Sequence, residues 1–209
     1  MLKIKTLPVG IIETNCYLVY DEETREAMVI DPGAEGRRIV DEIGELDLKV
    51  KYIVNTHGHG DHIMGNKEVK EATGADLLIH MEDGPMLTDS RLNLTNFMGR
   101  NVSEPAADRL LQEGDILTIG RYEFKVLHTP GHTRGGICLV GDGVVFSGDT
   151  LFQFSIGRDD FPGGSFKDLI NSIKTKLMPL DDSTVVYPGH GPKTTIGDER
   201  RGNPFLKLF

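Results

Sequence analysis

The chain has 209 residues, which is enough for one large domain with a buried core. Hydrophobic residues make up 38% and charged residues 26%, a balance that favours a globular chain over a disordered one. The net charge of -9 and the sequence pI of about 5.2 disfavour a nucleic-acid partner, because binding to phosphates depends largely on Lys and Arg.

The apolar segments are short. None approaches the ~20 residues of a membrane span, and the N-terminus lacks the sustained apolar run of a secretory signal. We therefore expect a cytoplasmic protein with no membrane partner. The two cysteines, Cys16 and Cys138, lie in apolar runs and form no CxxC pair, so we expect buried free thiols.

The first half of the chain alternates between strand and helix patterns. Strands are predicted at residues 2–9, 15–20, 27–30, 50–55 and 75–80. Helices are predicted at 37–46 and 64–73, with a shorter one at 82–87. Residues 88–106 are irregular and rich in Asn, Ser and Arg, and we expect them to flank the functional site as a lid or to form a surface excursion.

The second half begins with short strands separated by turn signals. They are predicted at 116–119, 122–127, 136–140 and 144–146, with a Gly-Asp-Gly hairpin signal before the last. An amphipathic helix at 166–177 and a strand at 184–187 follow. We find no linker or repeat and expect residues 1–209 to form a single domain. Two β-rich halves followed by helices favour two packed sheets with helices outside.

The most informative stretch is Thr-His-Gly-His-Gly-Asp-His at residues 56–62, directly after a predicted strand. Imidazole and carboxylate together suit zinc, iron or manganese, and the glycines let the backbone turn tightly. His57 and His59, two residues apart, are placed to reach one ion. The adjacent Asp61 and His62 more naturally face a second ion. The alternative is a polar turn with incidental histidines.

Three further ligand-type side chains follow predicted strands through glycine-containing turns. They are His132, Asp149 and His190. Each alone is equally well explained as a turn residue. Because strands of one sheet often end together, loops after several strands can meet at one point, and the combined set is sufficient for two ions.

This set resembles the metallo-β-lactamase-fold hydrolases, and more closely their glyoxalase II-like branch. The resemblance is carried by Asp31 after a strand, the His-x-His-x-Asp-His motif, and the segments 14–19, 129–133 and 148–152. It spans the chain from about residue 10 to the C-terminus. It implies an α+β fold, a four-layer αββα sandwich with the metal site at one edge of the two sheets.

The resemblance also implies how the metal ligands divide. One ion is held by three histidines, a second by one carboxylate and two histidines, and one carboxylate bridges the two ions. These sets are His57, His59 and His132; Asp61, His62 and His190; and Asp149. Asp31 resembles the family's supporting aspartate, which holds the ligand loop without binding metal. We expect two divalent ions, with zinc as first choice and iron or manganese as alternatives.

The implied activity is hydrolysis of a hydroxyacylglutathione-like thioester by hydroxide that two metal ions generate. Asp61 is also expected to orient this nucleophile, and the thiolate leaves without strong acid assistance because thiols ionise readily. Glyoxalase II carries a C-terminal helical domain that helps hold glutathione, whereas only residues 191–209 follow the last ligand here. The resemblance therefore leaves open whether the substrate is a glutathione thioester or another small-molecule thioester.

Four other polar side chains are weighed and given no catalytic role. We expect His80 to be a hydrogen-bonded structural residue and His128 to support the turn before the ligand at 132. Arg158 and Lys193 lie near the site in sequence and are expected to be solvated.

Other activities occur on this scaffold. A persulfide dioxygenase uses one iron held by two histidines and one carboxylate, which would here be His57, His132 and Asp149. A lactone or ester hydrolase is a further alternative, and the net charge disfavours a nuclease. A non-catalytic binding protein is least favoured, because every ligand position is filled. The sequence does not predict the oligomeric state.

Overall fold

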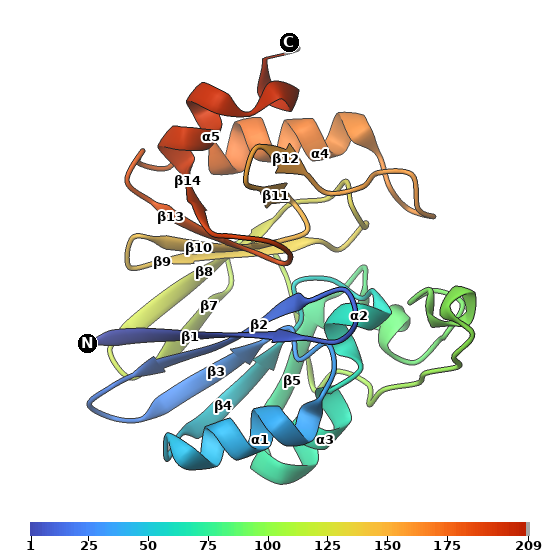
Figure 1. The fold of residues 1–209 in the computed structure, drawn as a ribbon, viewed down its shortest axis with the longest axis vertical. Helices are drawn as coiled ribbons and strands as arrows, with labels where there is room; N and C mark the ends of the chain where they lie inside the picture. Colours follow the sequence, from blue (N-terminus) through green and yellow to red (C-terminus); the bar gives the residue numbers. More distant parts are fainter. Residues whose placement is uncertain (208–209) are drawn as a thin grey trace.

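The structure is a computed structural model that describes residues 1–207, apart from the side chain of residue 98. Two six-stranded sheets face each other and helices cover their outer faces, giving the layer order helix, sheet, sheet, helix (Figure 1). This confirms the predicted α+β αββα sandwich. The last two residues of the predicted domain, 208–209, lie outside the described residues.

The first sheet has the strand order β1-β2-β3-β4-β5-β6. Its first three strands pair in antiparallel fashion, and the remaining strands add in parallel. Parallel neighbours need a crossover connection. Helix α1 supplies it between β3 and β4 and α3 between β4 and β5, on the outer face, whereas residues 81–108 join β5 to β6 without an α-helix. The elements are β1 (Leu2–Val9), β2 (Thr14–Asp21), β3 (Glu26–Ile30), α1 (Gly36–Glu45), β4 (Lys49–Val54), α2 (Gly60–Ile63), α3 (Asn66–Thr73), β5 (Asp76–His80) and β6 (Arg109–Leu111).

The second sheet has the order β14-β13-β10-β9-β8-β7. Its neighbours are antiparallel except for β10 and β13, whose crossover runs through α4 and the π-helical turn η3. The elements are β7 (Ile116–Ile119), β8 (Tyr122–His128), β9 (Ile137–Gly141), β10 (Val144–Gly148), α4 (Phe166–Ser172), η3 (Ile173–Leu177), β13 (Val185–Pro188), β14 (Thr194–Thr195) and α5 (Ile196–Gly202).

A few short elements complete the chain. The two-stranded β11 (Leu151–Phe152) and β12 (Ser155–Ile156) lie between the second sheet and α5, and the single-turn 3-10 helices are η1 (Gly84–Leu87), η2 (Thr95–Met98) and η4 (Pro204–Leu206). No helix within residues 1–207 combines the length and the apolar character that crossing a membrane requires.

Strand β2 shows how the alternating pattern builds the layers. Tyr17 and Val19 point into the core between the two sheets, where Phe124 and Phe146 of the second sheet meet them. Their neighbours Cys16 and Leu18 point the other way, into the core beneath α1 and α3. This alternation follows from the two-residue period of a strand. A third core joins the second sheet to α4 and α5 and contains Cys138, so the prediction of two buried free thiols is confirmed.

Some elements differ from their prediction for physical reasons. The helix predicted at 64–73 begins two residues later, as α3 at Asn66, because residues 64–65 form a turn after the short helix α2, which was not predicted in the His-rich loop. The helix at 166–177 leaves α-helical geometry after Ser172. Strands β6, β11, β12 and β14 are too short to show alternation. Helix α5 was missed because its pattern is weak, although Thr195 caps it by accepting from the Asp198 amide.

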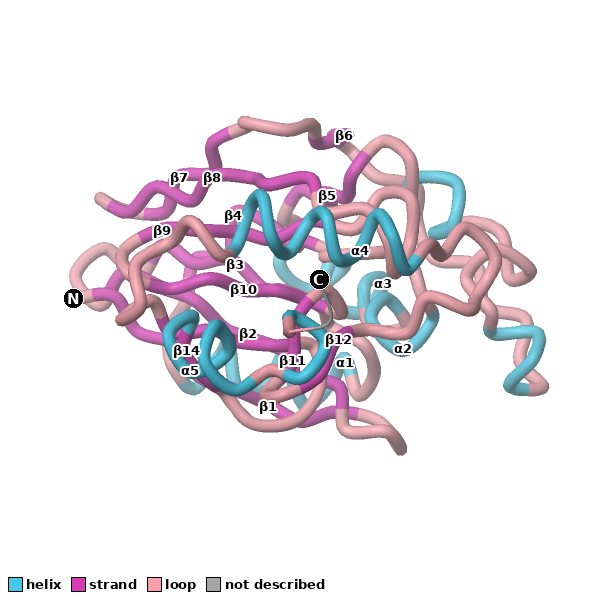
Figure 2. The backbone as a smooth tube through the Cα atoms, turned by 90° about the horizontal axis from the view of Figure 1, so that it is seen from above, coloured by secondary structure: helices cyan, strands magenta, loops and turns pink. Residues whose placement is uncertain are grey.

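Both views place the N-terminus at one edge of the two sheets and helix α2 at the opposite edge (Figures 1 and 2). Residues that follow β4, β8, β10 and β13 gather at the α2 edge. The fold therefore brings the predicted ligand loops of both sheets to one place.

Candidate metal centre

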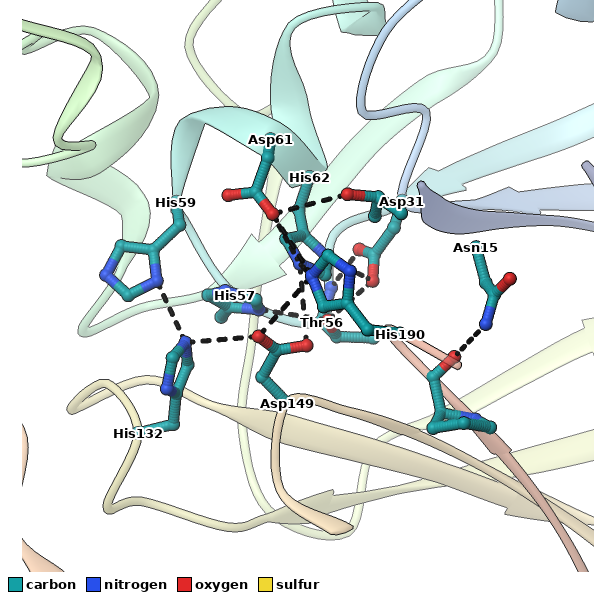
Figure 3. Close-up of polar contacts among 12 residues, drawn as sticks. Asn15, Asp31, Thr56, His57, His59, Asp61, His62, His132, Asp149 and His190 are labelled. Carbon is teal, nitrogen blue, oxygen red and sulfur yellow. Dashed lines mark hydrogen bonds and ion pairs between the residues drawn. The ribbon is translucent and has the colours of Figure 1, made fainter. Parts of the chain in front are cut away.

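All of the predicted metal ligands converge at the α2 edge (Figure 3). The first sheet contributes the loop after β4 and the first turn of α2. The second sheet contributes one residue after each of β8, β10 and β13. The seven side chains are His57, His59, Asp61, His62, His132, Asp149 and His190.

Three histidines form one cluster. The ligand-type nitrogens of His57, His59 and His132 all lie within 4.8 Å of one another, and all three side chains are buried. Nδ1 of His59 lies 2.9 Å from Nε2 of His132, although the two residues come from different sheets. Three imidazoles around one point form a typical donor set for a divalent transition metal.

A second cluster lies beside the first. It consists of Asp61, His62 and His190, again with ligand atoms within 4.8 Å of one another. Oδ2 of Asp61 lies 3.2 Å from Nε2 of His190 and 3.3 Å from Nε2 of His62. The same two nitrogens are 3.3 Å apart.

Asp149 lies between the two clusters. Its Oδ2 atom is 3.5 Å from Nε2 of His132 and 3.7 Å from Nε2 of His190, while its Oδ1 atom is 3.5 Å from Nε2 of His62. Its Oδ2 atom thus lies near ring nitrogens of both clusters, and the carboxylate is placed where a bridging ligand would lie.

Two buried atoms at this point find no hydrogen-bond partner among the described residues. They are Nε2 of His57 and Oδ1 of Asp149. A buried polar atom without a partner costs about 1–3 kcal/mol. Both atoms face the clusters, so a cation there would satisfy them, and the residues present fit bound divalent metal.

The outer ring nitrogens show which nitrogens are free to bind metal. Nδ1 of His132 lies 2.6 Å from the carbonyl oxygen of Arg158, and Nδ1 of His190 lies 3.2 Å from that of Ile12. A carbonyl only accepts, so each Nδ1 carries the proton and each Nε2 presents its lone pair to the cluster.

Asp31 fixes the ring orientation of the histidines that follow the first sheet in the same way. Its carboxylate accepts from the Thr56 hydroxyl at 2.6 Å and the Thr56 amide at 2.7 Å, and lies 3.0 Å from Nδ1 of His62. Because the Thr56 hydroxyl donates to Asp31, it is free to accept from Nδ1 of His57, 3.2 Å away. Asp31 therefore holds two ligand rings with their Nε2 atoms inward, one directly and one through Thr56.

Burial favours the neutral form of two rings of the first cluster. Burial and the adjacent His62 ring lower the pKa of His57 well below its ordinary value. Burial and the His132 ring lower the pKa of His59 to about 3. Neutral imidazole is the form that binds a metal, so these rings need no deprotonation near neutral pH.

The second cluster instead attracts positive charge. Burial by itself disfavours a charged His62, but the carboxylates of Asp61 and Asp149 outweigh burial and raise the pKa of His62. Burial also raises the pKa of Asp61, yet His62 and His190 outweigh it and hold that pKa well below its usual range. A divalent cation would meet the same demand for positive charge as these protons do.

Asp83 holds two loops of the candidate site together, and the sequence did not single it out. This buried carboxylate follows β5, and its Oδ2 atom accepts from the Gly58 amide at 3.1 Å and the Thr133 hydroxyl at 2.7 Å. Its Oδ1 atom accepts from the Gly135 amide at 2.7 Å. Asp83 thus ties the loop between His57 and His59 to the loop that follows His132. In the sequence, Glu-Asp-Gly-Pro reads only as the start of the short helix predicted at 82–87 and gives no sign of contacts to the ligand loops.

One glycine is required by the close packing of the centre. A Cβ atom added at Gly189 would overlap Oδ1 of Asp149 and crowd Cε1 of His62. The backbone of the loop after β13 therefore passes close behind the carboxylate of Asp149.

The remaining polar residues lie away from the clusters. The rings of His80 and His128 stack at a centroid distance of 4.0 Å. Nδ1 of His80 accepts from the Glu82 amide, and Nε2 of His128 donates to the carbonyl of Arg134, which agrees with their predicted structural roles. Lys193 is exposed.

A cavity of about 550 Å³ opens over the clusters. Five predicted ligands form its floor, and Asn93, Leu94 and Phe97 line it from the irregular 88–106 stretch. This stretch therefore flanks the site, as the sequence predicts. Its action as a lid stays a prediction.

Comparisons with known proteins agree with this geometry. The model of the metallo-beta-lactamase superfamily matches residues 9–190. Hydroxyacylglutathione hydrolase GloC of Haemophilus influenzae is 42% identical, with 98% of each chain covered. Two solved structures are similar: the BLEG-1 B3 metallo-beta-lactamase has a TM-score of 0.94 at 39% identity, covering 98% of this chain and all of that one. TTHA1623 in a di-iron-bound form has a TM-score of 0.86 at 36% identity, covering 97% and 100%.

The chain therefore belongs to the metallo-beta-lactamase superfamily. Within it, this protein is a metallo-hydrolase whose cluster of histidine and aspartate side chains suits divalent metal ions. The predicted family and fold are confirmed at this level.

Proposed function

We propose that this protein hydrolyses thioesters at a centre of two divalent metal ions. The observation that carries the proposal is the pair of adjacent three-residue clusters with Asp149 between them. The division follows the ligand sets expected from the family: His57, His59 and His132 for one ion, and Asp61, His62 and His190 for the other. The name of the Haemophilus relative supports a thioester as the substrate.

When bound, two such ions supply a lowered pKa for water and polarisation of a carbonyl oxygen. The side chains then provide placement. Oδ2 of Asp61 makes the contacts to His62 and His190 and accepts from the Thr14 hydroxyl at 3.2 Å. Among the described residues, Oδ1 of Asp61 is therefore free, and we assign it to orient the attacking water and to accept a proton from it. A leaving thiolate needs no acid beside it, because the pKa of a thiol is about 8.5.

The activity is tested by release of free thiol from S-lactoylglutathione and from acyl thioesters of smaller thiols, using zinc-loaded protein. We expect hydrolysis that a chelator abolishes and that Asp61→Asn reduces by at least about a hundredfold, in the range of a lost acid–base group. Full activity in Asp61→Asn would remove Asp61 from the mechanism. The same assay is repeated with iron-loaded and manganese-loaded protein. If none of the three metal-loaded forms hydrolyses any of these thioesters, the proposed function is contradicted.

The division of ligands is tested by substitution and metal analysis. His190→Ala removes a ligand of one cluster only, so we expect it to release mainly one ion per chain. Asp149→Ala removes the shared carboxylate and is expected to lose most bound metal. Equal losses in the two variants would contradict the division.

A further inference from the structure

The walls of the cavity over the metal centre are mostly apolar. Above the polar floor they are formed by three aromatic rings, two aliphatic side chains and a proline. These residues are Ile12, Leu94, Phe97, Phe152, Phe161 and Pro162. They come from separate segments of the chain, so the apolar wall surrounds the floor and is not one exposed helix face.

Besides Pro162, two of these side chains are exposed at the mouth of the cavity. Phe97 is 79% exposed and Ile12 is 54% exposed. Large apolar side chains that gather in the open beside a polar site typically mark a place where an apolar group binds. They would lose this exposure if an apolar part of the substrate lay against them.

The cavity offers little to an anionic group. Arg158 is the one Lys or Arg among its described lining residues. Its guanidinium already donates two hydrogen bonds to the carboxylate of Asp160, at 2.9 and 2.8 Å, and lies 4.2 Å above the Phe161 ring. A substrate with carboxylates, such as a glutathione thioester, would therefore find no unpaired cation on these walls.

From these observations we infer that the preferred substrates are uncharged thioesters that carry an apolar chain of several carbons. This inference rests on the proposed thioesterase function and names its substrate class. The chain lies against Phe97 and Ile12 while the carbonyl lies over the metal centre. The apolar chain can belong to the acyl group or to the thiol of the substrate. Two series of substrates, one varying each part, distinguish these alternatives.

The test measures kcat/KM of the zinc-loaded protein along both series. One series lengthens the acyl group from acetyl to hexanoyl on a fixed small uncharged thiol, and the other lengthens the thiol at a fixed acyl group. A fully buried methylene is worth up to about fourfold. Since the cavity encloses the chain only in part, we expect a rise on the order of fiftyfold over four methylenes in one of the series.

Variants show whether the walls cause this trend. Ile12→Ala and Phe97→Ala should each reduce the hexanoyl-to-acetyl ratio by at least about threefold, because each removes apolar contact area. Ile116→Ala is the matched control, since Ile116 is 45% exposed on β7 and does not line the cavity, and it should leave the ratio unchanged. Thioethers of increasing alkyl length, which cannot be hydrolysed, should show the same trend in Kd.

The outcomes separate the inference from the proposed function. Equal kcat/KM along both series would overturn the inference while leaving thioesterase activity intact. So would a preference above about a hundredfold, or ~2.7 kcal/mol, for S-lactoylglutathione over a matched uncharged lactoyl thioester. If no thioester is hydrolysed, the proposed function fails, and the thioether Kd series alone then decides whether the cavity selects apolar chains.

Discussion

The carboxylate of Asp83 provides a prediction that the structure makes in detail. Asp83→Asn keeps the shape of the side chain but leaves only one acceptor oxygen for three donors. If that oxygen takes the Oδ2 position, the Gly135 amide loses its acceptor; if it takes the Oδ1 position, the Gly58 amide does. The Thr133 hydroxyl can rotate and accept instead. At least one buried amide therefore loses its bond to a charged acceptor, at about 1.5–3 kcal/mol.

This loss should act on one metal ion. Asp83 joins the His57–His59 loop to the loop of His132, so Asp83→Asn loosens the three-histidine cluster. We expect affinity there to fall about 10- to 100-fold, the usual effect of losing a group that orients metal ligands. Affinity at the cluster of Asp61, His62 and His190 should stay within about twofold, because Asp83 contacts none of its residues.

The assay is competition of metal-free protein against a zinc chelator, which resolves two successive affinities. Asp31→Asn serves as the comparison, because Asp31 contacts His62 directly and His57 through Thr56 and should therefore weaken both ions. Urea unfolding of the metal-free variants measures stability separately. Unchanged affinities in Asp83→Asn, or equal weakening of both ions, would refute the reasoning.

Two other changes have outcomes that follow directly from the structure. Gly189→Ala should lose most bound metal, because its Cβ displaces Asp149. Gly44→Ala is the control: its Cβ meets nothing within 4 Å on α1, so this variant should retain both ions and gain up to about 1 kcal/mol of stability. Retention of both ions in Gly189→Ala would contradict the packing argument. Burial and the stacked His128 ring lower the pKa of His80 from its ordinary 6.5 to about 4. Below pH 6.5 the unfolded chain therefore binds the proton first, so the stability contributed by neutral His80 is complete above pH 6.5 and is lost as the pH falls toward 4. In urea unfolding of metal-free protein, wild type should lose more stability than His80→Asn between pH 7 and 4.5. Equal losses in the two proteins would show that protonation of His80 does not cause this loss of stability.

The candidate metal ligands could be predicted because they lie in short motifs. His57, His59, Asp61 and His62 place four candidate metal donors within one short loop segment, residues 57–62, directly after a predicted strand. The more distant His132 gained its meaning only in combination with the other candidate ligands and from the family resemblance, since a histidine after a glycine is ordinary by itself. Convergence of the two sheets at one edge then explains why these distant residues meet.

Apart from Asp31, the residues that support the site could not be predicted from local pattern. Asp83 acts through backbone amides of Gly58 and Gly135, and a backbone donor has no signature in the sequence. The apolar cavity wall has the same difficulty, because Ile12 and Phe97 become neighbours only through the fold. Short strands such as β14, with two residues, carry too little periodicity to detect.

The number of metal ions per chain tests the central claim most directly. Protein should be purified without added metal, loaded separately with zinc and with iron under anaerobic conditions, and analysed for metal content together with thiol release and dioxygen consumption. We predict two ions per chain and thioester hydrolysis without consumption of dioxygen. One iron per chain, with dioxygen consumed and no thioester hydrolysed, would contradict the account and favour persulfide dioxygenase chemistry at His57, His132 and Asp149.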